Sequence, residues 1–279
     1  MNAGGAILVI AGALAIAALI MAYPHLRRRW RAPADLDSRE RDALVAALPW
    51  RDLLDADQRE RLLEHSARLL AEVSFIGCNG LTVTRGMERV IAGQASLLCL
   101  GAEPGDFVLP REILVYPDAF YIPQDDPDEH GLVDDLPMLA SGEAWAGGRV
   151  ILSWRDIVEA LAGADHNVVL HEFAHLLDFA APEAEGAPPM HDFAGWSGAF
   201  GDAFERLRAE GSPVIDVYGA ENPTEFFAVA VEAFFQRGDA LAAAHPRLHA
   251  VMVAYFDIDT AARPPDFGPP AGAGEEDGT

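Results

Sequence analysis

Apolar residues recur at helical spacing along most of this chain, whereas two short stretches are apolar almost throughout. The helical pattern predicts two or three helices within 33–73 and further helices over 84–100, 154–163, 167–179, 198–211, 222–237 and 245–258. The stretches EILVYP (112–117) and RVILSW (149–154) contain β-branched residues and predict strands. We therefore expect one helix-rich α+β domain with a small β-sheet.

The first residues depart from this pattern because residues 2–24 carry no charged side chain. As a helix this segment is long enough to cross a hydrocarbon core of ~30 Å. No Lys or Arg precedes it, and four arginines follow it directly, at positions 27, 28, 29 and 31. The positive-inside rule then predicts a single-pass anchor over 1–25 in the cytoplasmic (inner) membrane, with the catalytic domain in the cytoplasm. The alternative is a core helix or an uncleaved secretion signal.

Composition bears on nucleic-acid binding, on the role of the cysteines and on the extent of the folded domain. The net charge of −24 and the pI near 4.5 argue against direct nucleic-acid binding, which needs a basic face. Cys78 and Cys99 lack the spacing of a metal site and are predicted to be core thiols in a reducing compartment, with a single disulfide as the alternative. Residues 265–279 are rich in Pro, Gly and acidic side chains and predict a disordered tail, which leaves 26–264 as the folded domain.

One predicted helix, NVVLHEFAHLLDF (167–179), is apolar except for a single polar stripe. At about 100° per residue, His171, Glu172, His175 and Asp178 share roughly a third of the helix circumference. A helix this apolar is buried on nearly all sides, so its polar stripe must face something that compensates for lost solvation. A metal cation would provide that compensation.

The spacing HExxH has a mechanical reason. His171 and His175 stand one turn apart on the same face, so both imidazoles can reach one ion. Glu172 lies beside that ion, where it can take a proton from water and pass it to a leaving amine. Such a set with an open coordination position predicts catalytic Zn²⁺. Two satisfied histidines and a surface glutamate are the alternative, which fits an apolar helix poorly.

A third ligand must come from another segment. Asp178 and Ala181 occupy positions where the metzincin pattern needs Gly and His, so that pattern is absent, and Asp178 is better placed to orient a ligand or nearby backbone. The predicted helix 222–237 offers Glu225 and Glu232, seven residues apart on one side. Glu225 could instead complete a capping box, and Glu232 could pair with a neighbouring side chain such as Arg237. The pattern favours Glu225 and leaves both alternatives open.

Several separate motifs occur together in one order: LVYPDAF (114–120), SGEAW (141–145), GGRVILSW (147–154), HEFAHLLD (171–178), AGW (194–196) and IDVYGAENPTEFFAVAVEAFF (215–235). From about residue 48 to the last predicted helix, the chain resembles the Mlc titration factor A-like zinc peptidases, a gluzincin-type group. The resemblance implies a zincin-like domain in which His171, His175 and Glu225 bind zinc. It also implies that Glu172 is the general base and acid, and that Glu232 is a second-shell or helix-packing residue.

The resemblance extends to two further positions. Tyr218 matches a tyrosine that lies near the zinc, and its phenol could donate a hydrogen bond to an oxyanion. Relatives often carry, in the segment GLVxx, a histidine that is a fourth ligand in an inactive state. This chain departs from that pattern with Asp134, and His130 is the alternative. RVILSW is predicted to edge the cleft, and Trp145 and Trp154 are predicted to pack in the core.

These observations predict a membrane-anchored cytoplasmic zinc metallopeptidase, aminopeptidase-like, that acts on peptide substrates. The resemblance also implies a regulatory role through a transcriptional repressor of sugar uptake. The alternative is a non-catalytic binding regulator that titrates such a repressor at the membrane, although a pure binder has no need of Glu172. A zinc hydrolase acting on non-peptide amides is a third interpretation.

Overall fold

The computed structural model describes residues 36–102, 109–122, 138–140, 142–145, 148–179, 186 and 193–268. The predicted anchor, His130 and Asp134 lie outside these residues, as does the tail beyond 268. Within them, no helix has both the length and the apolar character needed to span a bilayer. The described elements are α2 (Ser38–Ala46), η1 (Arg51–Leu53), α3 (Ala56–Glu72), β1 (Ser74–Gly77), α4 (Arg85–Leu97), β2 (Glu112–Tyr116), β3 (Phe120–Ile122), β4 (Met138–Ala140), β5 (Gly142–Trp145), β6 (Arg149–Ser153), α5 (Trp154–Leu161), α6 (Val168–Phe179), α7 (Phe193–Glu210), η2 (Val217–Ala220), α8 (Pro223–Gln236), α9 (Gly238–Ala244) and α10 (Pro246–Phe256).

The main sheet has the strand order β1-β2-β6-β5. Strands β1, β2 and β6 are parallel, and β5 pairs antiparallel with β6. RVILSW is predicted to edge the cleft as a strand to which a peptide could add. That prediction is wrong, because β6 is paired on both sides and β5 is the edge strand. Burial gives the reason, since four consecutive residues of β6 are buried, as expected for a strand covered on both faces. Strands β3 and β4 form a separate antiparallel pair.

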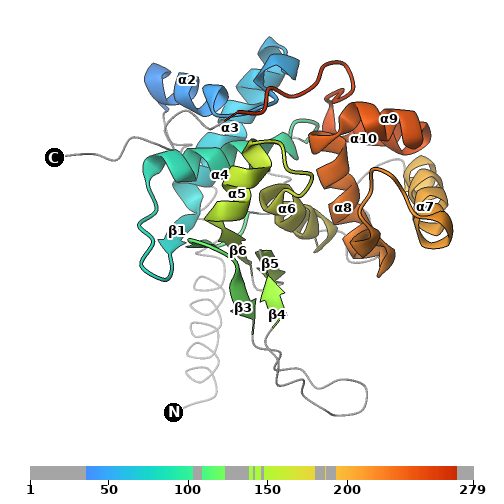
Figure 1. Cartoon of the computed structure of the whole chain (residues 1–279). Helices are drawn as coiled ribbons and strands as arrows, with labels where there is room; N and C mark the ends of the chain where they lie inside the picture. The colour runs from blue at the N-terminus through green and yellow to red at the C-terminus, as the bar shows by residue number, and fades with distance from the viewer. Residues whose placement is uncertain are drawn as a thin grey trace, which may run out of the picture.

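Helix α6 is the central element of the domain. It contacts β5 and β6 on the sheet, and it also contacts α4, α5 and α8. The N-terminal helices α2 to α4 and the C-terminal helices α7 to α10 lie on opposite sides of it (Figure 1). Every residue of α6 except Phe179 is buried, which confirms the burial inferred from its composition. The helix-rich α+β class with a small sheet is likewise confirmed.

Most predicted elements appear near their expected positions, with a few differences. Helix α7 begins at Phe193, five residues before the predicted start. The short elements that the sequence pattern does not predict are β1, β3, β4, β5, η2 and α9. Trp154 is partly buried against the core, as expected. Cys99 is a free, buried thiol, whereas Cys78 is free but partly exposed. Packing continues past residue 264, because the Phe267 ring meets Trp50 edge-on with centroids 6.2 Å apart.

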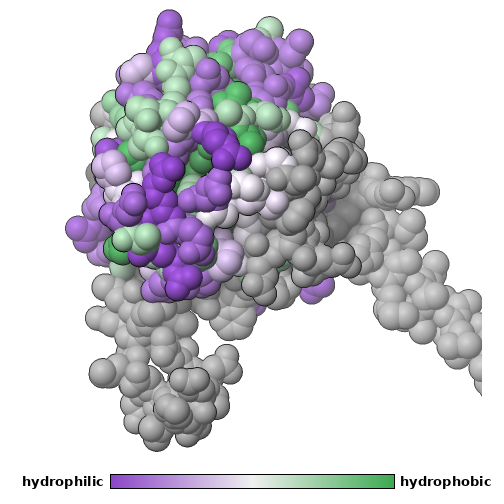
Figure 2. All heavy atoms as spheres, turned by 90° about the vertical axis from the view of Figure 1, so that its right-hand side faces the viewer, coloured by the Kyte–Doolittle hydropathy of each residue, from purple (hydrophilic) through white to green (hydrophobic). Residues whose placement is uncertain are grey.

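The outer face formed by the C-terminal helices is solvated. Figure 2 shows this side of the molecule, where hydrophilic residues surround smaller hydrophobic areas. Ion pairs such as Arg247 with Asp202 connect α10 to α7 there, and both side chains are largely exposed. Exposed pairs of this kind contribute little to stability, so the helices are held mainly by their buried apolar residues.

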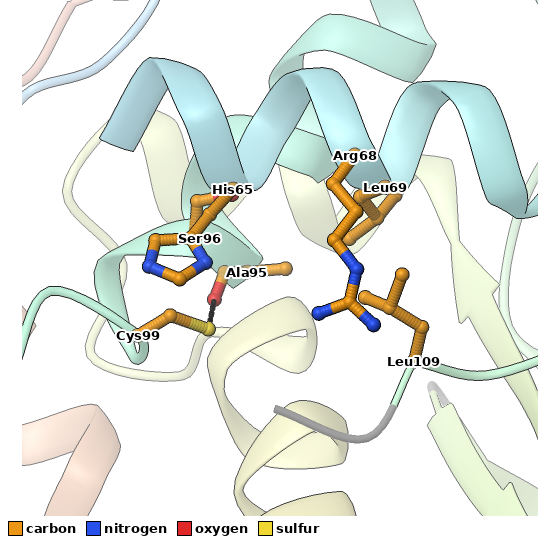
Figure 3. Close-up of a pocket in the computed structure, with 7 residues that line it drawn as sticks. All are labelled: His65, Arg68, Leu69, Ala95, Ser96, Cys99 and Leu109. Atoms are coloured by element: carbon orange, nitrogen blue, oxygen red, sulfur yellow. Dashed lines mark hydrogen bonds between the residues drawn. The ribbon is translucent and has the colours of Figure 1, made fainter. Parts of the chain in front are cut away.

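A small polar pocket lies between α3 and α4 (Figure 3). It is lined by His65, Arg68, Leu69, Ala95, Ser96, Cys99 and Leu109. His65 is buried, and its Nε2 atom has no hydrogen-bond partner. Burial and the nearby charge of Arg68 lower the pKa of this imidazole below its usual 6.5. The folded protein therefore resists protonation of His65 more than the unfolded chain does.

This pocket generates a pH-dependent prediction. As pH falls through 6.5, the unfolded chain takes up a proton on His65, whereas the folded chain, with its lowered pKa, takes it up only at lower pH. The contribution of His65 to the free energy of unfolding should therefore decrease as pH falls from about 7.5 to about 5.5. His65→Gln lacks this contribution, so the slope of its unfolding free energy against pH should be smaller over this range, as urea unfolding at several pH values would show. Buried His245 and His249, whose pKa values are also lowered, contribute to the pH dependence of both proteins alike. An equal slope in the two proteins would contradict the assignment to His65.

Candidate metal centre

The two histidines of the HExxH segment are placed by a well-capped helix. The Leu170 amide donates to Asn167 Oδ1 at 3.1 Å, and the His171 amide donates to the Asn167 carbonyl at 2.9 Å. Asn167 thus begins α6 one turn before His171. His171 and His175 are 7% and 9% exposed, so their imidazoles face the protein interior. Their Nε2 atoms lie 3.1 Å apart.

Glu225 reaches the same place from the first turn of α8. Asn222 is the N-cap, and its Oδ1 accepts a hydrogen bond from the Glu225 amide at 2.9 Å, with Pro223 at the first helical position. The Glu225 carboxylate points to the histidines, with Oε2 3.3 Å from His171 Nε2 and 3.5 Å from His175 Nε2. The capping-box alternative for its side chain is therefore not realised.

The spacing of these three atoms fits a metal ion. Ligand atoms about 2.0–2.1 Å from a tetrahedral zinc lie roughly 3.3–3.4 Å from one another, and the observed separations are 3.1, 3.3 and 3.5 Å. Glu225 Oε2 is buried and is within ion-pair distance of both imidazoles, yet it makes no hydrogen bond. Lone pairs that meet in this way need a positive charge among them, which a proton on an imidazole or a metal ion can supply. One carboxylate and two imidazoles suit Zn²⁺.

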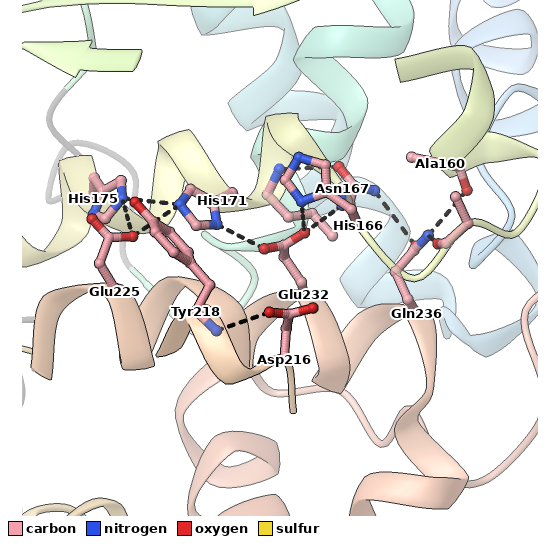
Figure 4. Close-up of polar contacts among 12 residues, drawn as sticks. Ala160, His166, Asn167, His171, His175, Asp216, Tyr218, Glu225, Glu232 and Gln236 are labelled. Atoms are coloured by element: carbon pink, nitrogen blue, oxygen red, sulfur yellow. Dashed lines mark hydrogen bonds and ion pairs between the residues drawn. The ribbon is translucent and has the colours of Figure 1, made fainter. Parts of the chain in front are cut away.

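A neighbouring group of similar residues behaves differently. Glu232 contacts His171 Nδ1 at 2.7 Å and His166 Nδ1 at 2.6 Å, and it accepts a hydrogen bond from the Asn167 amide (Figure 4). Separations this short are those of hydrogen bonds, in which a proton lies between the two atoms. If Nδ1 of His171 carries that proton, its Nε2 lone pair is free for a metal. Glu232 therefore orients His171 and does not pair with Arg237, which contacts Asp165.

The charges at this site attract a cation. Burial alone would raise the pKa of the Glu225 and Glu232 carboxyls, but contacts with the histidines lower each to about 2. Burial alone would also lower the pKa of His171, yet these two carboxylates raise it to about 10. A field that holds a proton this strongly also favours a divalent ion, which competes with the proton for His171.

Glu172 and Tyr218 flank the three converging atoms. Glu172 is 5% exposed and its Oε2 has no hydrogen-bond partner. Burial raises the pKa of Glu172 to about 7, although the charges on the two histidines oppose this. Tyr218 lies in η2, where its amide donates to Asp216 at 2.8 Å, and its ring stacks on His171 with centroids 6.3 Å apart. Burial and the charge of Glu225 raise its pKa to about 12, so the phenol keeps its proton at neutral pH.

The remaining predicted residues are not brought to this point. Asp178 accepts hydrogen bonds from the Gly186 amide at 2.7 Å and from Thr224 Oγ1 at 2.8 Å. It thus contacts backbone and a neighbouring helix, as its position suggested. Asp134, His130 and the side chain of Trp145 lie outside the described part of the chain.

Sequence reasoning missed His166, Asn167 and Thr224. His166 and Asn167 directly precede the HExxH helix, where a cap and a partner for Glu232 could have been sought. Thr224 stands next to Glu225, but nothing in its local pattern indicates that its hydroxyl contacts Asp178.

Comparison with known proteins places these residues in a family context. The model of the family described as glucose-regulated metallo-peptidase M90 matches residues 24–257. The chain is 34% identical over 233 residues to a protein of Serratia proteamaculans named Mlc titration factor A, covering 80% of this chain and 87% of that protein. A Yersinia pestis protein of the same name is 32% identical over 221 residues, covering 75% and 81%. A Synechocystis protein, slr2042, is 35% identical over 270 residues, covering 88% and 94%.

Measuring bound zinc can test whether the metal binds at His171, His175 and Glu225 or at His166, His171 and Glu232. His175→Asn removes one of the three converging atoms and should abolish stoichiometric zinc after gel filtration. His166→Asn removes only a hydrogen-bond partner of Glu232 and should retain zinc at about the stoichiometry of the unaltered protein. If His166→Asn lost its zinc while His175→Asn kept it, the metal would belong to the other group.

Proposed function

Because the chain belongs to the glucose-regulated metallo-peptidase M90 family, we propose that it is a zinc-dependent peptidase that hydrolyses peptide bonds at the centre formed by His171, His175 and Glu225. One observation carries the proposal: three lone-pair atoms converge at 3.1–3.5 Å in a buried site. Glu172 Oε2, which has no hydrogen-bond partner, belongs to a carboxyl whose pKa is affected by these same residues. Ligands, a proton acceptor and a proton donor are thus assembled in one place.

A bound zinc ion would supply Lewis acidity toward water and toward the substrate carbonyl. Glu172 takes a proton from the attacking water as that oxygen forms its bond to the carbonyl carbon. The same carboxyl then gives the proton to the departing amine nitrogen, so it returns to its starting state. A carboxyl whose pKa burial raises to about 7 suits both transfers, because near neutral pH it can accept a proton and also release it.

Two other side chains have supporting roles in the proposal. Tyr218 keeps its proton at neutral pH and can donate a hydrogen bond to the oxyanion that develops on the carbonyl oxygen. Glu232 holds the His171 ring through Nδ1, which fixes the direction of Nε2. Aminopeptidase-like cleavage of peptide ends belongs to the same proposal, and the peptide panel described below tests it.

The proposal extends to the place of action. Residues 1–25 would anchor the chain in the cytoplasmic membrane, which is supported by the uncharged run 2–24 and by the arginines that follow it. The peptidase domain would then face the cytoplasm. Its acidic surface suits a protein that does not bind nucleic acid directly.

A second role is supported by the names of two relatives, each a Mlc titration factor A. We propose that this chain also binds a transcriptional repressor and so takes part in regulation. A purely non-catalytic regulator is the alternative, in which the peptidase residues would be dispensable. The two roles are compatible, because binding a repressor uses a surface and hydrolysis uses the buried centre.

The role of Glu172 can be tested with the zinc-loaded full-length protein in detergent and a panel of fluorogenic peptides. Glu172→Gln keeps the size of the side chain but removes its capacity to accept a proton. We expect it to bind zinc normally and to lose at least about a hundredfold in kcat/KM. Equal inactivity of both zinc-loaded proteins on every peptide would favour the non-catalytic regulator. Including amino-blocked peptides would show whether a free N-terminus is needed.

The anchor can be tested by fractionating cells that express the full chain. The protein should sediment with membranes and should be released by detergent but not by high salt. A variant lacking residues 2–24 should appear in the soluble fraction. Release of the full chain by salt alone would show that it lies on the membrane surface and does not span it.

A further inference from the structure

The hydrogen bond between Asp178 and Thr224 joins the two helices that carry the metal-binding side chains. Asp178 lies in the last turn of α6, three residues after His175, and Thr224 lies in the first turn of α8, next to Glu225. Their side chains meet at 2.8 Å. The same two helical turns also meet at His175 and Glu225, where Nε2 and Oε2 are 3.5 Å apart.

A second contact extends this junction to the connection after α6. Asp178 Oδ1 accepts a hydrogen bond from the Gly186 amide at 2.7 Å. Gly186 has φ +74°, and a Cβ atom there would lie 2.5 Å from the Pro223 carbonyl oxygen. The Gly186 backbone thus fits tightly against the first residue of α8, and only glycine is accommodated.

Asp178 can hold the first turn of α8 at a fixed position relative to α6. It is 6% exposed, so its carboxylate is largely desolvated and depends on its hydrogen-bond donors. One oxygen faces Gly186 and the other faces Thr224. Losing the Thr224 hydroxyl would leave that oxygen without this buried donor, and the first turn of α8 could move away.

We infer that Thr224 is a positioning residue for Glu225 and acts through Asp178. This inference rests on the proposed function, because it takes Glu225 as the third metal ligand. The Asn222 cap fixes the start of α8 along its own axis, since it holds the Glu225 amide. The Asp178–Thr224 bond fixes that turn against α6, and so sets how far the Glu225 carboxylate stands from the two imidazoles. Ligand atoms already at the right spacing lose less conformational entropy when they bind the ion.

The test compares Thr224→Val, which keeps the shape but removes the hydroxyl, with Thr224→Ser, which keeps the hydroxyl. Zinc affinity would be measured on the full chain by competition with a chromophoric chelator, and the absorption spectrum of the cobalt-loaded protein would report ligand geometry. Loss of a partner that orients a ligand typically weakens metal binding about 10–100-fold. We expect that loss and an altered cobalt spectrum in Thr224→Val, and near-normal behaviour in Thr224→Ser.

Two further variants separate the possible failures. Glu225→Gln should lose zinc affinity at least as strongly as Thr224→Val, and unchanged affinity there would remove Glu225 from the proposed metal centre. If Glu225→Gln lost affinity while Thr224→Val kept both affinity and spectrum, only the positioning role would be overturned. The double variant Asp178→Ala/Thr224→Val should bind zinc no more weakly than Asp178→Ala, because Thr224 acts through Asp178. Additive losses would contradict that route.

Discussion

Two imidazoles and a carboxylate direct their lone pairs at one another across the contact between α6 and α8. The atoms stand 3.1–3.5 Å apart in a site where each residue has lost most of its water. Such an arrangement is unfavourable without a positive charge among the three atoms. The surrounding protein must therefore hold these three groups at a fixed spacing, and much of its architecture serves that purpose.

Apolar packing provides the first part of this restraint. Helix α6 is enclosed by the sheet and by α8, and the phenylalanines of α8 are almost completely buried. Hydrogen bonds provide the second part, because packing alone does not fix the rotation of an imidazole. Glu232 holds His171 through Nδ1, and Asn167 caps the helix and donates its amide to Glu232. At the other end of α6, Asp178 joins Gly186 and Thr224.

Glu232 and Glu225 differ in how far their carboxylate oxygens lie from the histidine nitrogens. Glu232 contacts both of its histidines at 2.6–2.7 Å, so its oxygens are occupied by protons. Glu225 contacts its two histidines at 3.3–3.5 Å without a hydrogen bond. Two glutamates that lie seven residues apart on one helix therefore differ in what they can bind. Glu232 holds the ring of His171, and Glu225 leaves an oxygen without a hydrogen bond beside both imidazoles.

The sequence by itself determined the helix-rich α+β class, the HExxH segment and the start of α8 at Asn222, because these depend on residues close together in the chain. It also limited the candidates for a third metal ligand to two glutamates and favoured Glu225 of the two, without excluding Glu232. Only the tertiary structure decided that Glu225 faces both imidazoles, that Glu232 bridges His166 and His171, and that β5 forms the sheet edge. Those outcomes depend on how α6 and α8 cross and on which strands pair. The contacts of α8 with α6 and with His166 join residues about 50 to 66 positions apart, and hydrophobic periodicity reports only on residues within one element, so it reveals neither these contacts nor the strand order.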